Sequence, residues 1–157
     1  MNQLAKRILD LYARLGRAEF IARLVARLCV GLMFLGGALH KATHLGDFVA
    51  YFQSLHIPAP ALQAPFVVAV EFCGGLGLML GLLTRPAAFL LSGTMVVALA
   101  TAAIPDHHIH ANWKGLLDFL YLPETLLLLI LGWLILAGAG RASLDWYLLQ
   151  KLNKPQQ

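Results

Sequence analysis

The segment APFVVAVEFCGGLGLMLGLL, residues 64–83, decides the fold class, because it is a continuous apolar run interrupted by one charge, Glu71. About 20 apolar residues are enough for an α-helix to cross the hydrocarbon of a bilayer. A charged side chain at mid-depth costs at least about 2.5–3.5 kcal/mol, so Glu71 is expected to face a partner or a wet cavity. The expected partner is Lys41, which ends another apolar run, residues 24–42. We therefore predict that Lys41 and Glu71 meet inside a membrane protein.

The composition of the whole chain also indicates a membrane protein. Of its 157 residues, 59% are hydrophobic and only 13% are charged, whereas a soluble domain has about 45–50% apolar and about 25% charged residues. Apolar runs near residues 24–43, 64–83, 86–105 and 116–138 approach the length of a transmembrane helix. Lipid offers no hydrogen-bond partner to backbone N–H and C=O groups, so a spanning segment must be a helix or part of a closed β-barrel. The runs are continuously apolar and do not alternate between apolar and polar residues as barrel strands do, so we predict helices. The predicted fold is an all-α, integral membrane four-helix bundle.

The basic residues predict the orientation of this bundle. Of the 12 lysines and arginines, only Lys41 and Lys114 fall on the side opposite the N-terminus, the turn near residue 84 and the C-terminal tail. The positive-inside rule then places both termini in the cytoplasm and all 6 histidines on the outer side. Anionic lipid headgroups explain the net charge of +4 without a nucleic-acid partner.

Three regions follow along the chain. Residues 1–23 are amphipathic and are expected to form a cytoplasmic helix on the inner membrane surface. Residues 24–140 form the four-helix membrane domain. Residues 141–157 form a cytoplasmic tail, in which Ser143 is expected to cap a short helix. A short interfacial helix is expected over 45–55 in the outer loop.

Small residues in the apolar runs predict close helix contacts. Gly37 lies one turn before Lys41 and is expected to let another backbone approach. Cys29 and Cys73 lack a C-x-x-C or metal-type spacing, so we interpret both as packing residues. The small-residue faces permit a homo-oligomer without requiring one.

Pro123 leaves the start of the fourth helix open. The helix either begins near Asn112 and kinks at Pro123, or begins with Pro123 at its first position. In the second case Glu124 lies in the first turn, where the helix dipole favours a carboxylate. Asp118 and Glu124 join the outer polar cluster in one interpretation, and in the other Asp118 pairs with Lys114.

The histidines are candidate metal ligands. His40 and His44 are one helical turn apart, a spacing that lets two imidazoles converge on a metal ion. One hypothesis is a copper or zinc site formed by His40, His44, His107 and His110. The alternative is that the histidines are amphipathic anchors at a wet membrane boundary. Haem held between His40 and His107 is less favoured, because both lie near the surface.

Three stretches taken together resemble the DoxX family: RLCVGLMFLGGALHK (27–41), EFCGGLGLMLGLLTRPAA (71–88) and GAGRASLD (138–145). The resemblance covers nearly all of the chain from residue 24 onward and implies a four-helix bundle in a bacterial cytoplasmic membrane. The family motif would map onto Arg27, Lys41, Glu71, Arg85 and Asp145, whereas the histidines of 107–110 are not part of it. Family members look like accessory subunits of redox and metal-handling systems. One branch resembles a subunit of thiosulfate:quinone oxidoreductase, and others accompany copper-binding peptides.

These observations lead to one main functional hypothesis and its alternatives. We expect a non-catalytic, multi-pass inner-membrane accessory protein, embedded in the lipid bilayer, that supports a periplasmic redox or metal process through a partner protein. Its polar pocket, in the outer half of the bundle, would be lined by Lys41, Glu71 and nearby histidines, with Arg27 and Glu124 as further candidates. The alternative is a membrane subunit of a quinone-linked oxidoreductase, in which Glu71 or a histidine relays protons. The Lys41–Glu71 pair also has a purely structural interpretation, in which it only joins two helices of a scaffold without ligand.

Overall fold

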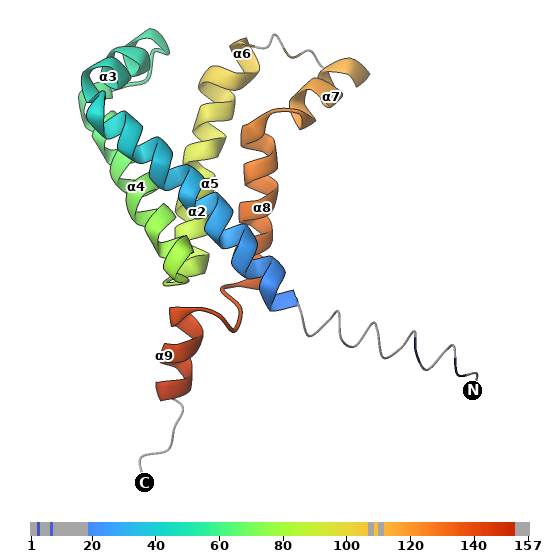
Figure 1. The fold of residues 1–157 in the computed structure, drawn as a ribbon. Helices are drawn as coiled ribbons and strands as arrows, with labels where there is room; N and C mark the ends of the chain where they lie inside the picture. Colours follow the sequence, from blue (N-terminus) through green and yellow to red (C-terminus); the bar gives the residue numbers. More distant parts are fainter. Residues whose placement is uncertain (1–2, 4–6, 8–18, 107–108, 110–111, 153–157) are drawn as a thin grey trace.

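The computed structural model of the chain describes residues 3, 7, 19–106, 109 and 112–152 (Figure 1). Most of the expected helix over 1–23, together with His107, His108 and His110, lies outside these residues. Within them, three helical stretches are long and apolar enough to cross a membrane: Glu19–Thr43, Pro60–Leu80 and Thr84–Ala103. Two further helices, Trp113–Leu120 and Pro123–Ala137, are long and apolar enough only when taken together as one span, and they are bent by 67° relative to each other. The predicted helical membrane bundle is confirmed.

The long helices pack in the order α2 (Glu19–Thr43), α4 (Pro60–Leu80), α5 (Thr84–Ala98), α8 (Pro123–Ala137), and the first and last of them make only a small contact. α2 packs along α4, α4 against α5, and α5 against α8. Figure 1 shows α2 crossing the others obliquely, and it also touches α8. α3 (Leu45–Ser54), α6 (Ile104–Asp106) and α7 (Trp113–Leu120) lie at one end of the bundle, called the α3 end below. α9 (Leu144–Leu152) lies at the other end, the α9 end.

The core is apolar and so is much of the surface. Val30 and Phe34 of α2 pack with Leu78 of α4, Leu91 of α5 and Leu131 of α8, and all five are buried. Large apolar side chains also remain exposed along the helices, such as Leu62, Phe66, Phe89 and Leu136. Exposed apolar surface of this extent is what lipid-facing helices present, whereas a soluble monomer rarely exposes large apolar patches.

Two glycines bring α2 and α4 together, and neither is the expected Gly37. A Cβ at Gly31 would lie 2.7 Å from the Gly75 carbonyl oxygen, and a Cβ at Gly75 would lie 2.9 Å from that of Gly31. Nothing lies within 4 Å of a Cβ at Gly37. The packing role proposed for Cys29 and Cys73 is also wrong, because both thiols are exposed. The contact face of α2 is set by Arg27, Val30, Gly31, Phe34 and Ala38, its buried residues.

The helix boundaries settle the question about Pro123. Pro123 occupies the first turn of α8, Glu124 lies beside it, and the break from α7 falls at Tyr121 and Leu122. The third helical stretch, expected over 86–105, runs from Thr84 to Asp106 and includes a π-helical segment, η1 (Leu99–Ala103). π-Helical turns inside longer helices are frequent at functional sites. The expected interfacial helix is α3, and Ser143 Oγ accepts from the Trp146 amide at 3.1 Å, which confirms the predicted cap of α9.

Candidate functional site

Lys41 and Glu71 form the predicted ion pair. Lys41 Nζ lies 2.7 Å from each carboxylate oxygen of Glu71. The Glu71 side chain is only 3% exposed, whereas that of Lys41 is 30% exposed. The ammonium therefore lies at the boundary between the protein interior and an open space, with the carboxylate behind it.

The surrounding elements explain why these two side chains meet. Lys41 is in the last turn of α2 and Glu71 is in the middle of α4, one turn before Gly75. The close approach of the two helices at Gly31 and Gly75 holds the faces carrying the pair together. The ring of Phe48, from α3, lies 5.1 Å from Lys41 Nζ, within the range of a cation–π interaction.

A cavity of about 670 Å³ opens beside the ion pair. Its walls come from α3, α4, α5, η1, the last turn of α2 and the first turn of α8. Most of the lining is apolar, and the polar exceptions among the described residues are Lys41, Tyr51, Gln63, Glu71, Thr94, Thr101 and Glu124. A cleft of this size with few polar groups is typical of a site for a small amphipathic molecule.

Glu124 joins this cavity, as one interpretation of the sequence predicted. It lies in the first turn of α8, lines the cavity and is half-buried. Asp118 does not line the cavity. It is exposed on α7, and the described residues show no ion pair between it and Lys114.

The two described histidines of the candidate metal site lie outside the cavity. His40 and His44 are exposed, and their ring centroids are 4.7 Å apart. His44 Nδ1 contacts the His40 carbonyl oxygen at 3.1 Å. Within the described residues no group of three or more His, Cys, Asp or Glu could hold a metal ion. Because His107 and His110 lie outside that part, the copper or zinc site stays a prediction.

Arg27 lies near the opposite end of the bundle from the ion pair. It precedes Lys41 by four turns of α2, roughly 20 Å along the helix. Its side chain is buried, with 1% exposure. Nε donates to the Leu78 carbonyl oxygen at 2.9 Å, and the guanidinium also donates to the carbonyl oxygens of Ala139 and Ala142. Arg27 thus donates hydrogen bonds to carbonyl groups at the C-terminal end of α4, which lack partners within the helix. It also links α2 to the segment that precedes α9.

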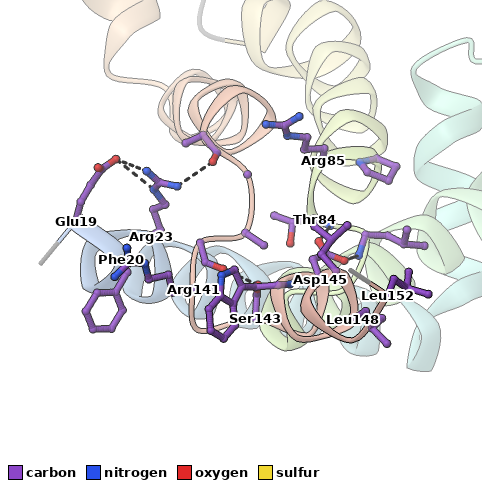
Figure 2. Close-up of a pocket in the computed structure, with 18 residues that line it drawn as sticks. Glu19, Phe20, Arg23, Thr84, Arg85, Arg141, Ser143, Asp145, Leu148 and Leu152 are labelled. Carbon is purple, nitrogen blue, oxygen red and sulfur yellow. Dashed lines mark hydrogen bonds and ion pairs between the residues drawn. The ribbon is translucent and has the colours of Figure 1, made fainter. Parts of the chain in front are cut away.

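Asp145 is a second structural group at the α9 end. Its carboxylate accepts from the backbone amides of Leu83 at 2.7 Å and Thr84 at 3.0 Å (Figure 2). Its own amide donates to the Gly81 carbonyl oxygen at 2.9 Å. The carboxylate therefore caps the N-terminus of α5 from a distant part of the chain. Arg27 and Asp145, two of the positions onto which the resemblance would map the family motif, stabilise the fold at the α9 end and do not line the α3-end cavity.

Sequence reasoning missed part of the cavity wall. Phe48, Gln63 and Thr94 line it, but the sequence did not predict any of them as site residues. Phe48 could have been found from the spacing of Phe48 and Phe52, one turn apart on α3, whose rings lie 4.5 Å apart. No pattern in the sequence distinguishes Gln63 or Thr94 from an ordinary helix residue.

Comparisons with known proteins agree with this architecture. The model of the DoxX family matches residues 22–104. Inner membrane protein YqjF of Escherichia coli (strain K12) is 30% identical over 138 residues, which are 86% of this chain and 98% of YqjF. Inner membrane protein YphA of the same strain is 33% identical over 97 residues, which are 62% of this chain and 67% of YphA. No solved structure matches the chain.

Proposed function

The chain belongs to the DoxX family, whose relatives above are inner-membrane proteins, and we propose that it is a non-catalytic accessory protein that binds a quinone. The quinone would occupy the α3-end cavity. Through a partner protein, the chain would support a redox process on the periplasmic side of the membrane.

The observation behind this proposal is the donor left over at Lys41. An ammonium group has three N–H donors, and the Glu71 carboxylate accepts two of them. Lys41 makes no other hydrogen bond to the described residues, and it lines the cavity. The third donor is therefore available to a ligand oxygen. A quinone carbonyl fits this donor, and the apolar walls fit the ring and the isoprenoid tail.

The orientation of the bundle supports a periplasmic role. The described basic residues of the helix ends, Arg23, Arg27, Arg85, Arg141 and Lys151, gather at the α9 end. By the positive-inside rule this end faces the cytoplasm, so both termini are cytoplasmic and the cavity is in the outer half of the bundle.

Equilibrium binding of a short-tailed ubiquinone analogue to the full chain in mild detergent tests the proposal. We expect saturable binding that weakens about tenfold or more in Lys41→Met/Glu71→Gln, because a hydrogen bond to a charged group contributes about 1.5–3 kcal/mol. The double variant avoids leaving a buried carboxylate unpaired. Lys114→Met, on exposed α7 and away from the cavity, is the matched control. Absence of saturable binding, or unchanged binding in the double variant, would refute the proposal.

A second candidate function is that of a membrane subunit of a quinone-linked oxidoreductase. Reduction of a quinone to a quinol consumes two protons and two electrons, and two carboxylates, Glu71 and Glu124, line the cavity. Reduction of the quinone analogue to its quinol by the purified chain, with thiosulfate as the electron donor, favours this candidate. Binding without turnover favours the accessory role.

The histidine metal site is tested separately. Calorimetry of the full chain with Cu²⁺ and Zn²⁺, repeated with His40→Asn/His44→Asn, decides it. Binding that disappears in the variant supports the site, and absence of binding removes it.

A further inference from the structure

A second cavity lies at the α9 end, away from the ion pair. Its volume is about 830 Å³ (Figure 2). The first turns of α2 and α5, the end of α8 and one side of α9 line it. Because three membrane-crossing stretches start or end there, the cavity lies at the level where lipid headgroups meet the protein.

Three arginines reach this cavity from separate segments. Figure 2 shows Arg23 on α2, Arg85 on α5 and Arg141 in the turn before α9. Arg23 is already paired, since it contacts Glu19 at 2.5 Å and donates to the Ala137 carbonyl oxygen. Arg85 donates from one nitrogen to the Leu136 carbonyl oxygen at 3.2 Å.

Two of these cations remain without a counter-ion. In the described part of the chain, Arg85 and Arg141 form no ion pair, and both are exposed. Asp145 also lines the cavity, but its two oxygens accept from the backbone amides at the start of α5. Each guanidinium therefore has donors free for an anion, and phosphate oxygens match the planar fork of arginine.

The rest of the lining suits acyl chains. Phe20 of α2 and Leu148, Leu149 and Leu152 of α9 line the same cavity and are exposed, Leu152 to 80%. Charged donors above an apolar wall, at the end of membrane-spanning helices, fit an amphiphile with an anionic head.

We propose that this cavity binds an anionic phospholipid, with its phosphate held by Arg85 and Arg141 and its acyl chains against α9. The inference does not depend on the function proposed for the α3-end cavity. The bound lipid would fasten α9 to the bundle at the membrane surface, beside the contact that Asp145 makes with α5.

Native mass spectrometry of the full chain in detergent tests this site. The probes are dioctanoyl phosphatidylglycerol, dioctanoyl phosphatidylcholine and glycerol 3-phosphate, each titrated over the same range. We expect phosphatidylglycerol to bind more tightly than phosphatidylcholine, and glycerol 3-phosphate not to bind. Arg141→Gln should weaken phosphatidylglycerol binding about fivefold, because each basic residue contributes about 1 kcal/mol to the binding of an anionic lipid.

Two further variants keep the test specific. Arg85→Gln should weaken binding by a similar factor, and circular dichroism checks that both variants remain folded. Arg141 makes no hydrogen bond to the described residues, so its removal should leave the fold intact. Lys114→Gln, at the α3 end, should bind like the wild type.

Three results would overturn the proposal. The first is equal affinity for the anionic and the zwitterionic lipid. The second is wild-type affinity in both arginine variants, or an equal loss in Lys114→Gln. The third is glycerol 3-phosphate binding as tightly as the lipid, which would make the site one for a soluble phosphate compound.

Discussion

Replacing Lys41 by Met is expected to destabilise the protein far more than replacing Glu71 by Gln. Lys41→Met leaves a carboxylate that is 3% exposed without its counter-ion. Breaking a buried pair from one side costs about 3–5 kcal/mol. Glu71→Gln leaves instead an ammonium on a side chain that is 30% exposed and lines an open cavity. Because water can reach that ammonium, we expect a cost of about 1 kcal/mol.

The double variant allows the interaction energy between Lys41 and Glu71 to be measured in a double-mutant cycle. Lys41→Met/Glu71→Gln removes both charges, so its stability should be close to that of Glu71→Gln alone. The coupling is the cost of the double variant minus the sum of the two single costs. It therefore equals in size the cost of Lys41→Met, about 3–5 kcal/mol. Such a value would exceed the 0.2–1 kcal/mol or so of an exposed pair.

Reversible unfolding in mixed micelles, followed by far-UV circular dichroism, measures all four proteins. Lys114→Met controls for the loss of an exposed lysine and should stay within about 0.5 kcal/mol of the wild type. Equal costs for the two single variants, or a coupling below about 0.5 kcal/mol, would show that Glu71 does not depend on Lys41.

The same unfolding measurement checks three further expectations. Gly31→Ala should cost about 1–3 kcal/mol, because its Cβ would lie 2.7 Å from a carbonyl oxygen of α4, and an equal cost for Gly37→Ala would contradict this close approach. Arg27→Met should cost about 3 kcal/mol or more, because several carbonyl oxygens lose a charged donor; a loss below about 1 kcal/mol would refute that role. Asp145→Ala should cost about 0.5–2 kcal/mol through the lost cap of α5, whereas Asp118→Ala, on the exposed side of α7, should be neutral; similar values for both would argue against the cap.

The sequence predicted two kinds of feature: those that a single segment determines, and those whose absence would cost much free energy. Apolar runs long enough to span a bilayer specify helices, because lipid offers no other partner for the backbone. The cost of a lone acid in such a run led directly from Glu71 to Lys41. For Pro123 the sequence allowed only two positions, a kink inside a helix or the start of one, and the structure shows the start, where the missing N–H costs no hydrogen bond.

Other features depend on neighbours that the sequence does not reveal. Gly31 and Gly37 are equivalent in sequence terms, and only the crossing of α2 over α4 makes Gly31 the contact. The hydrogen-bond partners of Arg27 are backbone carbonyl groups. Every residue carries such a group, so the sequence does not reveal which ones Arg27 contacts. Likewise, residues of six helical segments line the α3-end cavity, and no single segment contains the pattern of the site.

Blocking the α3-end cavity without touching its charges tests the central claim most directly. Gly93 of α5 lines the cavity, and nothing lies within 4 Å of a Cβ there, so the larger side chain of Gly93→Leu would take up part of the ligand's space. Gly36→Leu, on α2 and with the same free space, is the matched control away from the cavity. We predict that binding of the short-tailed ubiquinone analogue is lost in Gly93→Leu and kept in Gly36→Leu. Unchanged quinone binding in Gly93→Leu would contradict the account.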